Sequence, residues 1–194
     1  MATAIVTATI AGTGCQTQMT KPSGFLSTYS NLAKVNDSTW RYVNEQQLAA
    51  CESFYIAPIQ VLVNEYSGTT LTPEQKQQAA AQFRQVIDRK LLGHYRVVDQ
   101  PGPDTGVLRA AITTAYKVGT SLGLGLEGEI INPKTGKQIA AVRTYQVGAP
   151  TGGGPMASEA LDVSFIWWDR PDATMIMEQW ADRLLEALNK AHRK

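Results

Sequence analysis

The chain contains few of the residues that catalysis and metal binding use most often. It has only two histidines, His94 and His192, and two cysteines, Cys15 and Cys51, among 194 residues. These four side chains are far apart in the sequence, whereas a zinc site needs clustered ligands. No close pair of acidic residues is expected within the core strands, so catalysis by paired carboxylates is not expected either. The sequence predicts no metal, no cofactor and no catalytic residue, and a protein that is not an enzyme.

Strong net charge and long hydrophobic runs are also missing. The formal net charge is +1, which gives no electrostatic basis for binding nucleic acid. No apolar stretch approaches the roughly 20 residues that a transmembrane helix needs. The length suits one domain that buries its own core.

The only candidate targeting segment is at the N-terminus. Residues 1–14 are small and largely apolar and end at Cys15, which is typical of a secretory signal followed by the first mature residue. No Lys or Arg precedes Cys15, and a start upstream of Met1 would account for this. The alternative is a disordered tail. Cys51 is interpreted as a buried free thiol, with pairing to Cys15 left open for an oxidising compartment.

Three segments are expected along the chain. Residues 1–15 form the signal-like segment, 16–42 a tether and an irregular wrapping segment, and 43–194 a single α/β domain. The wrapping segment carries anchors spaced among turn-forming residues: Phe25, Leu26, Tyr29, Leu32, Trp40 and Tyr42.

Two helices are predicted within the domain. Thr72, Pro73 and Gln75 form a capping box and a helix start, Gly93 supplies a left-handed stop, and the apolar face between them consists of Ala79, Phe83, Val86, Ile87 and Leu91. The last helix is expected to begin near Asp172, with an apolar stripe of Ile176, Trp180, Leu184 and Leu188.

Several strands are predicted around these helices. They cover residues 54–63, 95–99, 107–116, 122–131 and 137–147, with 157–168 as a further candidate. Pro58 argues against full pairing of the strand at 54–63, and Gly136 allows a tight turn between the strands at 122–131 and 137–147. A helix between two strands implies a parallel pair, and hairpins imply antiparallel ones. The expected fold class is α+β, with one mixed, mostly antiparallel sheet, two main helices on one face and the order strand–helix–strands–helix.

Three motifs admit a functional and a structural interpretation. Residues 123–128 spell GLGLEG, the spacing of a dinucleotide site, but a strand follows instead of the helix that such a site needs. The glycines are interpreted as a strip against which an aromatic ring or a backbone packs. The glycine-rich residues 151–155 lack the Lys of a phosphate loop and are expected to form a flexible loop. Trp167 and Trp168 are expected to point to opposite faces of a strand, one into the core, with a recognition or membrane-contact surface as the alternative.

Several stretches together resemble a bacterial lipoprotein family known as domain of unknown function 3313. The resemblance extends from Cys15 to the C-terminus and is carried by residues 23–32, 40–43, 95–104, 107–109, 135–136 and 180–184. It implies a Gram-negative exported protein that is acylated on Cys15, and Gln16 in place of Asp implies the outer membrane, on its periplasmic face. It implies no activity.

The leading hypothesis is a membrane-anchored periplasmic binding or envelope-assembly module. It would contact the membrane through lipid on Cys15 and meet an envelope protein partner, without binding nucleotide or nucleic acid. One alternative is a small hydrolase or transferase that uses His94 near the turn at residues 101–104. Another is a structural, homo-oligomeric envelope protein, which an exposed apolar patch near Trp168 would favour.

Overall fold

A computed structural model describes residues 21–66, 69–118, 121–148, 168 and 170–193. Its main feature is a sheet of eight strands in the order β1-β2-β10-β9-β8-β3-β7, with β4 paired to β8. In chain order these strands are β1 (Ala33–Asn36), β2 (Thr39–Val43), β3 (Ser53–Ile56), β4 (Gln60–Val61), β7 (Arg96–Val97), β8 (Thr105–Val118), β9 (Ser121–Ile131) and β10 (Gln138–Val147). A separate small ribbon pairs β5 (Glu65–Tyr66) with β6 (Thr69–Thr70).

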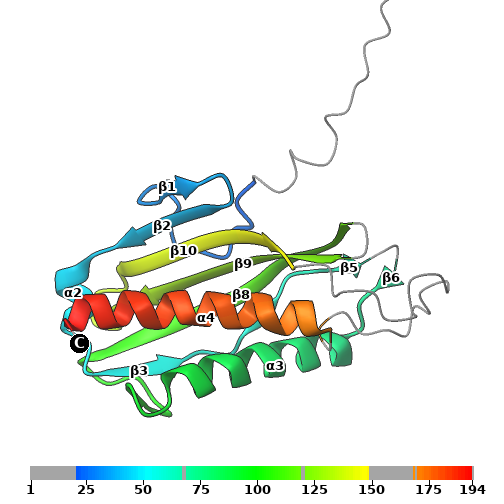
Figure 1. Ribbon diagram of the computed structural model, residues 1–194. Coiled ribbons are helices and arrows are strands. Elements are labelled where there is room, and N and C mark those ends of the chain that lie inside the picture. Colours follow the sequence, from blue (N-terminus) through cyan, green and yellow to red (C-terminus); the bar gives the residue numbers. More distant parts are fainter. Residues whose placement is uncertain (1–20, 67–68, 119–120, 149–167, 169, 194) are drawn as a thin grey trace, which may run out of the picture.

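Helices α3 (Pro73–Leu91) and α4 (Pro171–His192) lie on one face of the large sheet (Figure 1), and the short α2 (Glu45–Ala49) lies at one end, near the end of α4. Strand β3 pairs in parallel with both β7 and β8, whereas β8, β9 and β10 pair antiparallel. The expected α+β class, with a mixed and mostly antiparallel sheet, is therefore confirmed. Within the described residues, no helix is both long enough and apolar enough to cross a membrane.

Helix α3 follows the sequence prediction closely. The Thr72 hydroxyl accepts from the Gln75 amide, and the Gln75 side chain accepts from the Thr72 amide. Its buried side chains are Ala79, Phe83, Val86, Ile87 and Leu91, and Gly93 after its end has a φ of 78°. Local capping and spacing were sufficient here because they satisfy the free backbone donors and place one stripe against the sheet.

Helix α4 begins with Pro171 at its first position and packs on β9, β10 and α3. Trp180 is a buried tryptophan of the core, and it meets the Phe83 ring edge-on at 5.2 Å between centroids. Asp172 fastens the start of α4 to β9 by accepting from the Leu122 amide at 2.8 Å. The contact between Trp180 and Phe83 therefore joins the two helices at the centre of the apolar layer.

Two expectations about strands need correction. The segment 16–42 was expected to be irregular, but β1 and β2 lie at residues 33–43 and extend the sheet beyond β10. Pairing with β10 supplies backbone partners that the local sequence does not reveal. The strand expected at 54–63 is interrupted between β3 and β4 around Pro58, because proline has no amide hydrogen for the ladder.

A bulge in β8 changes which side chains share a face. Strict alternation over residues 107–116 would place Leu108 and Tyr116 on one face, but the register with β9 shifts between Ile112 and Thr114. Leu108, Ala110 and Ile112 face the helices, whereas Thr114 and Tyr116 lie against Gly125 and Gly123 on the other face. An extra residue reverses the alternation of a strand, and strict periodicity cannot predict it.

The strip of glycines in β9 is confirmed as a packing feature. A Cβ atom on Gly123 would overlap the Tyr116 ring, and one on Gly128 would overlap the Trp180 ring. Residues 149–167 lie outside the described part of the chain, as do the glycine-rich residues 151–155, most of the strand expected at 157–168, and Trp167.

Candidate functional site

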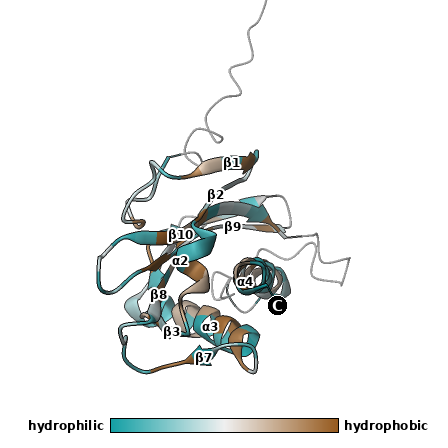
Figure 2. Ribbon diagram, turned by 90° about the vertical axis from the view of Figure 1, so that its left-hand side faces the viewer, coloured by the Kyte–Doolittle hydropathy of each residue, from teal (hydrophilic) through white to brown (hydrophobic). Residues whose placement is uncertain are grey.

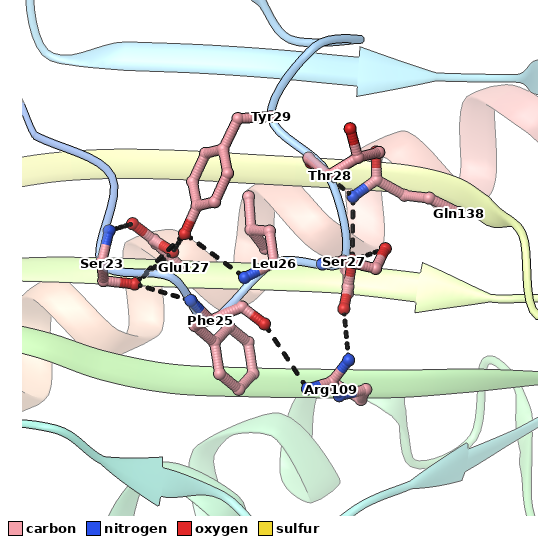
Figure 3. Close-up of polar contacts among 10 residues, drawn as sticks. Ser23, Phe25, Leu26, Ser27, Thr28, Tyr29, Arg109, Glu127 and Gln138 are labelled. Carbon is pink, nitrogen blue, oxygen red and sulfur yellow. Dashed lines mark hydrogen bonds and ion pairs between the residues drawn. The ribbon is translucent and has the colours of Figure 1, made fainter.

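The face of the sheet opposite the helices carries a polar site of its own. Residues of β9 alternate, so that Leu124, Leu126 and Gly128 face the helices while Glu127 and Glu129 face the other way. Residues 21–32, called the strap below, cross this second face over β8, β9 and β10 (Figure 3). Both carboxylates lie beneath the strap and are essentially inaccessible to solvent, at 0% and 1% exposed.

Glu127 binds the strap at two separate positions, Ser23 and Tyr29. Its Oε2 atom accepts from the Ser23 hydroxyl at 2.7 Å and from the Tyr29 hydroxyl at 2.6 Å, and its Oε1 atom accepts from the Ser23 amide at 3.4 Å. Arg143, directly opposite on β10, places Nε 3.4 Å from Oε1. The charge of Glu127 is thus balanced within the sheet and its lone pairs are used by the strap.

Glu129 binds the strap in the same way at Ser27, between those two positions. Its Oε2 atom accepts from the amide and hydroxyl of Ser27, at 2.9 and 2.7 Å, and from the Gln138 side chain at 2.8 Å. Its Oε1 atom accepts from Arg109 on β8 at 2.7 Å. Each glutamate therefore pairs with an arginine of a neighbouring strand and turns its remaining acceptor positions toward the strap.

The strap's backbone carbonyls are bound by donors of the sheet. Arg143 donates to the Lys21 carbonyl at 2.6 Å, Arg109 to that of Phe25 at 3.4 Å, and Gln138 to that of Thr28 at 3.1 Å. Contacts to main-chain groups fix the position and direction of the segment, while contacts to Ser and Tyr hydroxyls depend on its sequence.

Apolar anchors complete the site. Phe25 and Leu26 are buried against Ala111 and Ala141, whose small side chains leave room beside the glutamates. The Arg109 guanidinium lies 5.0 Å from the centroid of the Phe25 ring, a cation–π distance. Thus two arginines each bind both a carboxylate and a strap residue, which couples the strap to the charge pairs.

This arrangement binds a peptide segment but leaves no reactive group exposed. Burial, and then the hydrogen bond to Glu127, raise the pKa of Tyr29, so its phenol stays protonated and keeps donating. A general base needs access to a substrate proton, whereas both carboxylates are covered and already accept several hydrogen bonds. The chemistry that this site supports is therefore attachment of the strap.

The expectation of no close acidic pair in the core strands was wrong. Glu127 and Glu129 are such a pair, on one face of the central strand β9. A signal was present in the sequence, because Glu at alternate positions of an otherwise apolar and glycine-rich strand marks one face as polar. What the sequence could not provide was the strap as the partner, since it lies about 100 positions away.

The other residues singled out by sequence lie apart from this site. His94 is exposed in the turn after α3, where its backbone amide donates to Leu91, and the described residues place no hydrogen-bonding side chain on its ring. His192 at the end of α4 has its two ring nitrogens 2.8 and 3.0 Å from the carbonyl oxygens of Leu188 and Cys51. The nucleophile that a hydrolase using His94 requires is thus not found in the part of the chain that the structure describes.

Of the cysteines and tryptophans singled out by sequence, the structure describes Cys51 and Trp168. Cys51 is a buried free thiol, as expected, and burial followed by the charge of Asp104 raises its pKa. Trp168 is 2% exposed and belongs to the core, while its neighbours 149–167 and 169, where an apolar patch near it was considered, lie outside the described residues. Cys15 lies outside the described residues. Residues 21–66, 69–118, 121–148, 168 and 170–193 contain no group of three or more acidic, His or Cys side chains placed to bind a metal.

The fold and this site define a class of protein: an α+β domain with helices on one sheet face and an N-terminal strap attached by buried charges to the other. The chain belongs to the family described as protein of unknown function (DUF3313), which it matches over residues 21–123. That match begins at the strap and includes part of β9. No curated protein matches the chain significantly.

Solved structures share the general layout only loosely. A PelC dodecamer from Paraburkholderia phytofirmans is 13% identical, with a TM-score of 0.47 over 78% of this chain and 96% of that chain. A DUF4136 family protein from Bacteroides thetaiotaomicron is 12% identical, with a TM-score of 0.41 over 82% of this chain and 98% of that chain. Similarity at this level transfers neither an activity nor an oligomeric state.

Proposed function

We propose that this protein is a lipid-anchored module of the bacterial envelope that binds or assembles a partner, and that the strap connects its anchor to its fold. The anchor is Cys15, acylated at the periplasmic face of the outer membrane. The observation that carries the proposal is the strap itself, which starts six positions after Cys15 and is bound through buried Glu127 and Glu129.

The attachment limits how far the domain can lie from the membrane. The Lys21 carbonyl is bound by Arg143, and six fully extended residues span at most about 20 Å. A lipid on Cys15 therefore keeps the domain within about that distance of the bilayer surface. Without the strap contacts the tether would begin near β1, and roughly twelve more residues would lengthen that reach to about 60 Å.

The position of the strap also divides the surface of the domain between two tasks. The strap begins at Lys21 on the face opposite the helices, so α3 and α4 stay available to a partner (Figure 1). A single acyl chain binds a membrane only marginally, whereas several chains on one cysteine hold firmly. A short and firmly attached tether suits a protein that must meet its partner close to the membrane.

The anchor is tested by expressing the full chain, with its native upstream region, in a Gram-negative host. We expect the protein in the outer-membrane fraction of a sucrose gradient, resistant to a high-salt wash. The Cys15→Ala variant should move to the soluble periplasmic fraction. Cys51→Ala is the matched control, because it removes the chain's other thiol without touching the anchor, and it should remain in the membrane.

Two results would contradict the proposal. Retention of Cys15→Ala in the salt-washed membrane would mean that something other than a lipid holds the protein there. Mass spectrometry of the N-terminal peptide showing an unmodified Cys15 in membrane-bound protein would have the same meaning.

A further inference from the structure

A second feature lies on the helix side of the sheet, away from the strap. A cavity of about 260 Å³ opens between α4 and the strands β2 and β10. Its walls are largely apolar and include Val43, Ala140, Val142, Trp180, Leu184 and Ala187. We call this cavity the α4 groove.

The groove exists because the sheet is wider than the helices that cover it. Figure 2 shows β1 and β2 extending past α4, so the helix-side surface of β2 lies beside the helix instead of beneath it. Ala140 of β10 and Ala187 of α4 both line the cavity, and their small side chains leave space between strand and helix. Apolar surface thus remains accessible at this edge of the sheet.

Unpaired positive charge stands at the groove's mouth. Arg41 from β2 and Arg183 from α4 line it, together with one acidic residue, Glu186, and all three are exposed. Neither arginine forms an ion pair with a described residue, although Arg183 donates to the side-chain oxygen of Gln146. Glu129 contributes to the lining, but its carboxylate is bound to Arg109 and the strap on the other face.

We propose that the α4 groove binds a single-chain fatty carboxylate, with the acyl chain along the apolar wall and the carboxylate between Arg41 and Arg183. The volume exceeds the roughly 150 Å³ that accommodates benzene in an engineered cavity, and it is close to the lower end of ligand pockets, about 300 Å³. That space suits one acyl chain and not the two of a phospholipid. Guanidinium groups are the preferred partners of carboxylates because they offer paired donors.

This inference does not depend on the lipid anchor, and its test removes the anchor. The full chain carrying Cys15→Ala is titrated with sodium dodecanoate, below its micelle concentration, by isothermal calorimetry. We expect saturable binding with one site per chain. Ala187→Leu, which fills the groove, should weaken binding about tenfold or more.

The matched control for the wall is Ala80→Leu. Ala80 is also a partly buried alanine on a long helix, but it lines a different depression, between α3 and β4. Binding by Ala80→Leu should equal that of the parent. Equal binding by Ala187→Leu would overturn the proposal.

The head group is tested by charge. In Arg41→Gln/Arg183→Gln the affinity for dodecanoate should fall about tenfold or more, whereas Arg96→Gln, an exposed arginine on the opposite edge strand β7, should bind normally. Added salt should weaken binding to the parent and not to the double variant. Unchanged dodecanoate binding in the double variant would overturn the assignment of a carboxylate.

A further measurement detects a ligand in the groove of the parent protein by its effect on tryptophan fluorescence. 12-Bromododecanoate should quench the fluorescence of Trp180, and Trp180→Phe should remove that part of the quenching. No quenching in the parent protein would overturn the proposal even if a groove variant failed to fold. Binding of phosphatidylglycerol vesicles that is sensitive to Ala187→Leu, without any binding of dodecanoate, would also overturn it and would assign the groove to a lipid surface.

Discussion

The two faces of the sheet are held to their neighbouring segments by different forces. On the helix face, Trp180, Phe83 and the leucines of β9 form a continuous apolar layer. On the strap face, Glu127, Glu129, Arg109 and Arg143 hold a single irregular segment through hydrogen bonds. Because β9 contributes leucines to one face and glutamates to the other, adjacent residues of this strand pack against the helices and bind the strap in turn.

The two faces contribute differently to the stability of the fold and to the placement of its segments. Apolar burial stabilises the helix face by an amount that grows with the buried area and depends little on orientation. Buried charge pairs contribute little net stability, because removing them from water costs about as much as their attraction returns, but breaking one is costly. The strap face should therefore fix where the strap lies, while the helix face determines whether the domain folds.

The largest expected effect comes from the helix face. Trp180→Ala should lower the free energy of unfolding by about 3–5 kcal/mol, because it leaves a cavity between α4, Phe83 and Gly128. Urea unfolding measures this loss. Phe25→Ala on the strap should cost less and should increase hydrogen exchange mainly within residues 21–32, because the strap can detach while the helices stay packed. Equal global losses for both variants would show that the two faces unfold as one unit.

The next effect tests the charge pairs on the strap face. Glu127→Ala should cost about 3 kcal/mol, since it removes the carboxylate that balances the charge of the buried Arg143 guanidinium. Glu127→Leu/Arg143→Met should recover most of that loss while leaving the strap more mobile. The exposed pair of Glu178 with Arg89 is the control, and Glu178→Ala should cost less than about 1 kcal/mol. A double variant as unstable as Glu127→Ala would mean that the pair contributes real net stability.

A smaller effect depends on pH and lies where α4 begins. Burial alone raises the pKa of Asp172, but the hydrogen bonds from Arg170 and the Leu122 amide outweigh it, so the pKa lies below its ordinary value. A lowered pKa in the folded state stabilises the protein above the unfolded value of about 3.9, and this contribution is lost as the pH falls through the folded value. Asp172→Asn should cost about 2 kcal/mol at pH 7.

The pH dependence distinguishes this contribution from simple packing. Thermal unfolding followed from pH 7 to pH 3 should show the gap between parent and Asp172→Asn narrowing below about pH 4. A constant gap over this range would mean that the charge of Asp172 is not what stabilises the start of α4.

The smallest effect compares two glycines. Gly128→Ala should lose about 1–2 kcal/mol, because the added methyl group overlaps the Trp180 ring. Gly102→Ala is the control, since the nearest atom to its new Cβ, Thr105 Oγ1, is 3.5 Å away. If both variants unfolded at the same urea concentration, the close contact of Gly128 with the ring would not matter for stability.

Local patterns predicted some elements well and others poorly. The capping box at Thr72 and the apolar spacing of α3 were sufficient to define that helix, and Gly136 with its flanking strands defined the hairpin of β9 and β10. The first strand was located, but Pro58 divides it. Strands β1 and β2 were missed because their short, mixed sequences become strands only through pairing with β10. The bulge at Thr113 was missed because it inserts one residue into an otherwise regular alternation.

The sequence predicted the anchors of the strap but not the buried glutamates to which the strap is bound. The sequence identified Phe25, Leu26 and Tyr29 as anchors of a wrapping segment, and the first two are buried on the sheet. It did not identify Glu127, which was considered only as part of the GLGLEG motif, or Glu129, which follows that motif. The expectation of a lipid on Cys15 stays a prediction, as does the division of the chain at residues 15 and 42.

The class of fold, the two long helices and the lack of a recognisable catalytic motif could be read from the chain alone, because they depend on short-range capping, spacing and composition. The attachment of the N-terminal strap to two buried glutamates and the open groove beside α4 emerged only from the folded molecule. Ser23 and Glu127 are 104 positions apart in the chain, and the groove combines α4 with strands β2 and β10 from earlier parts of the sequence. The energies of both features depend on burial and distance, which a linear sequence does not contain.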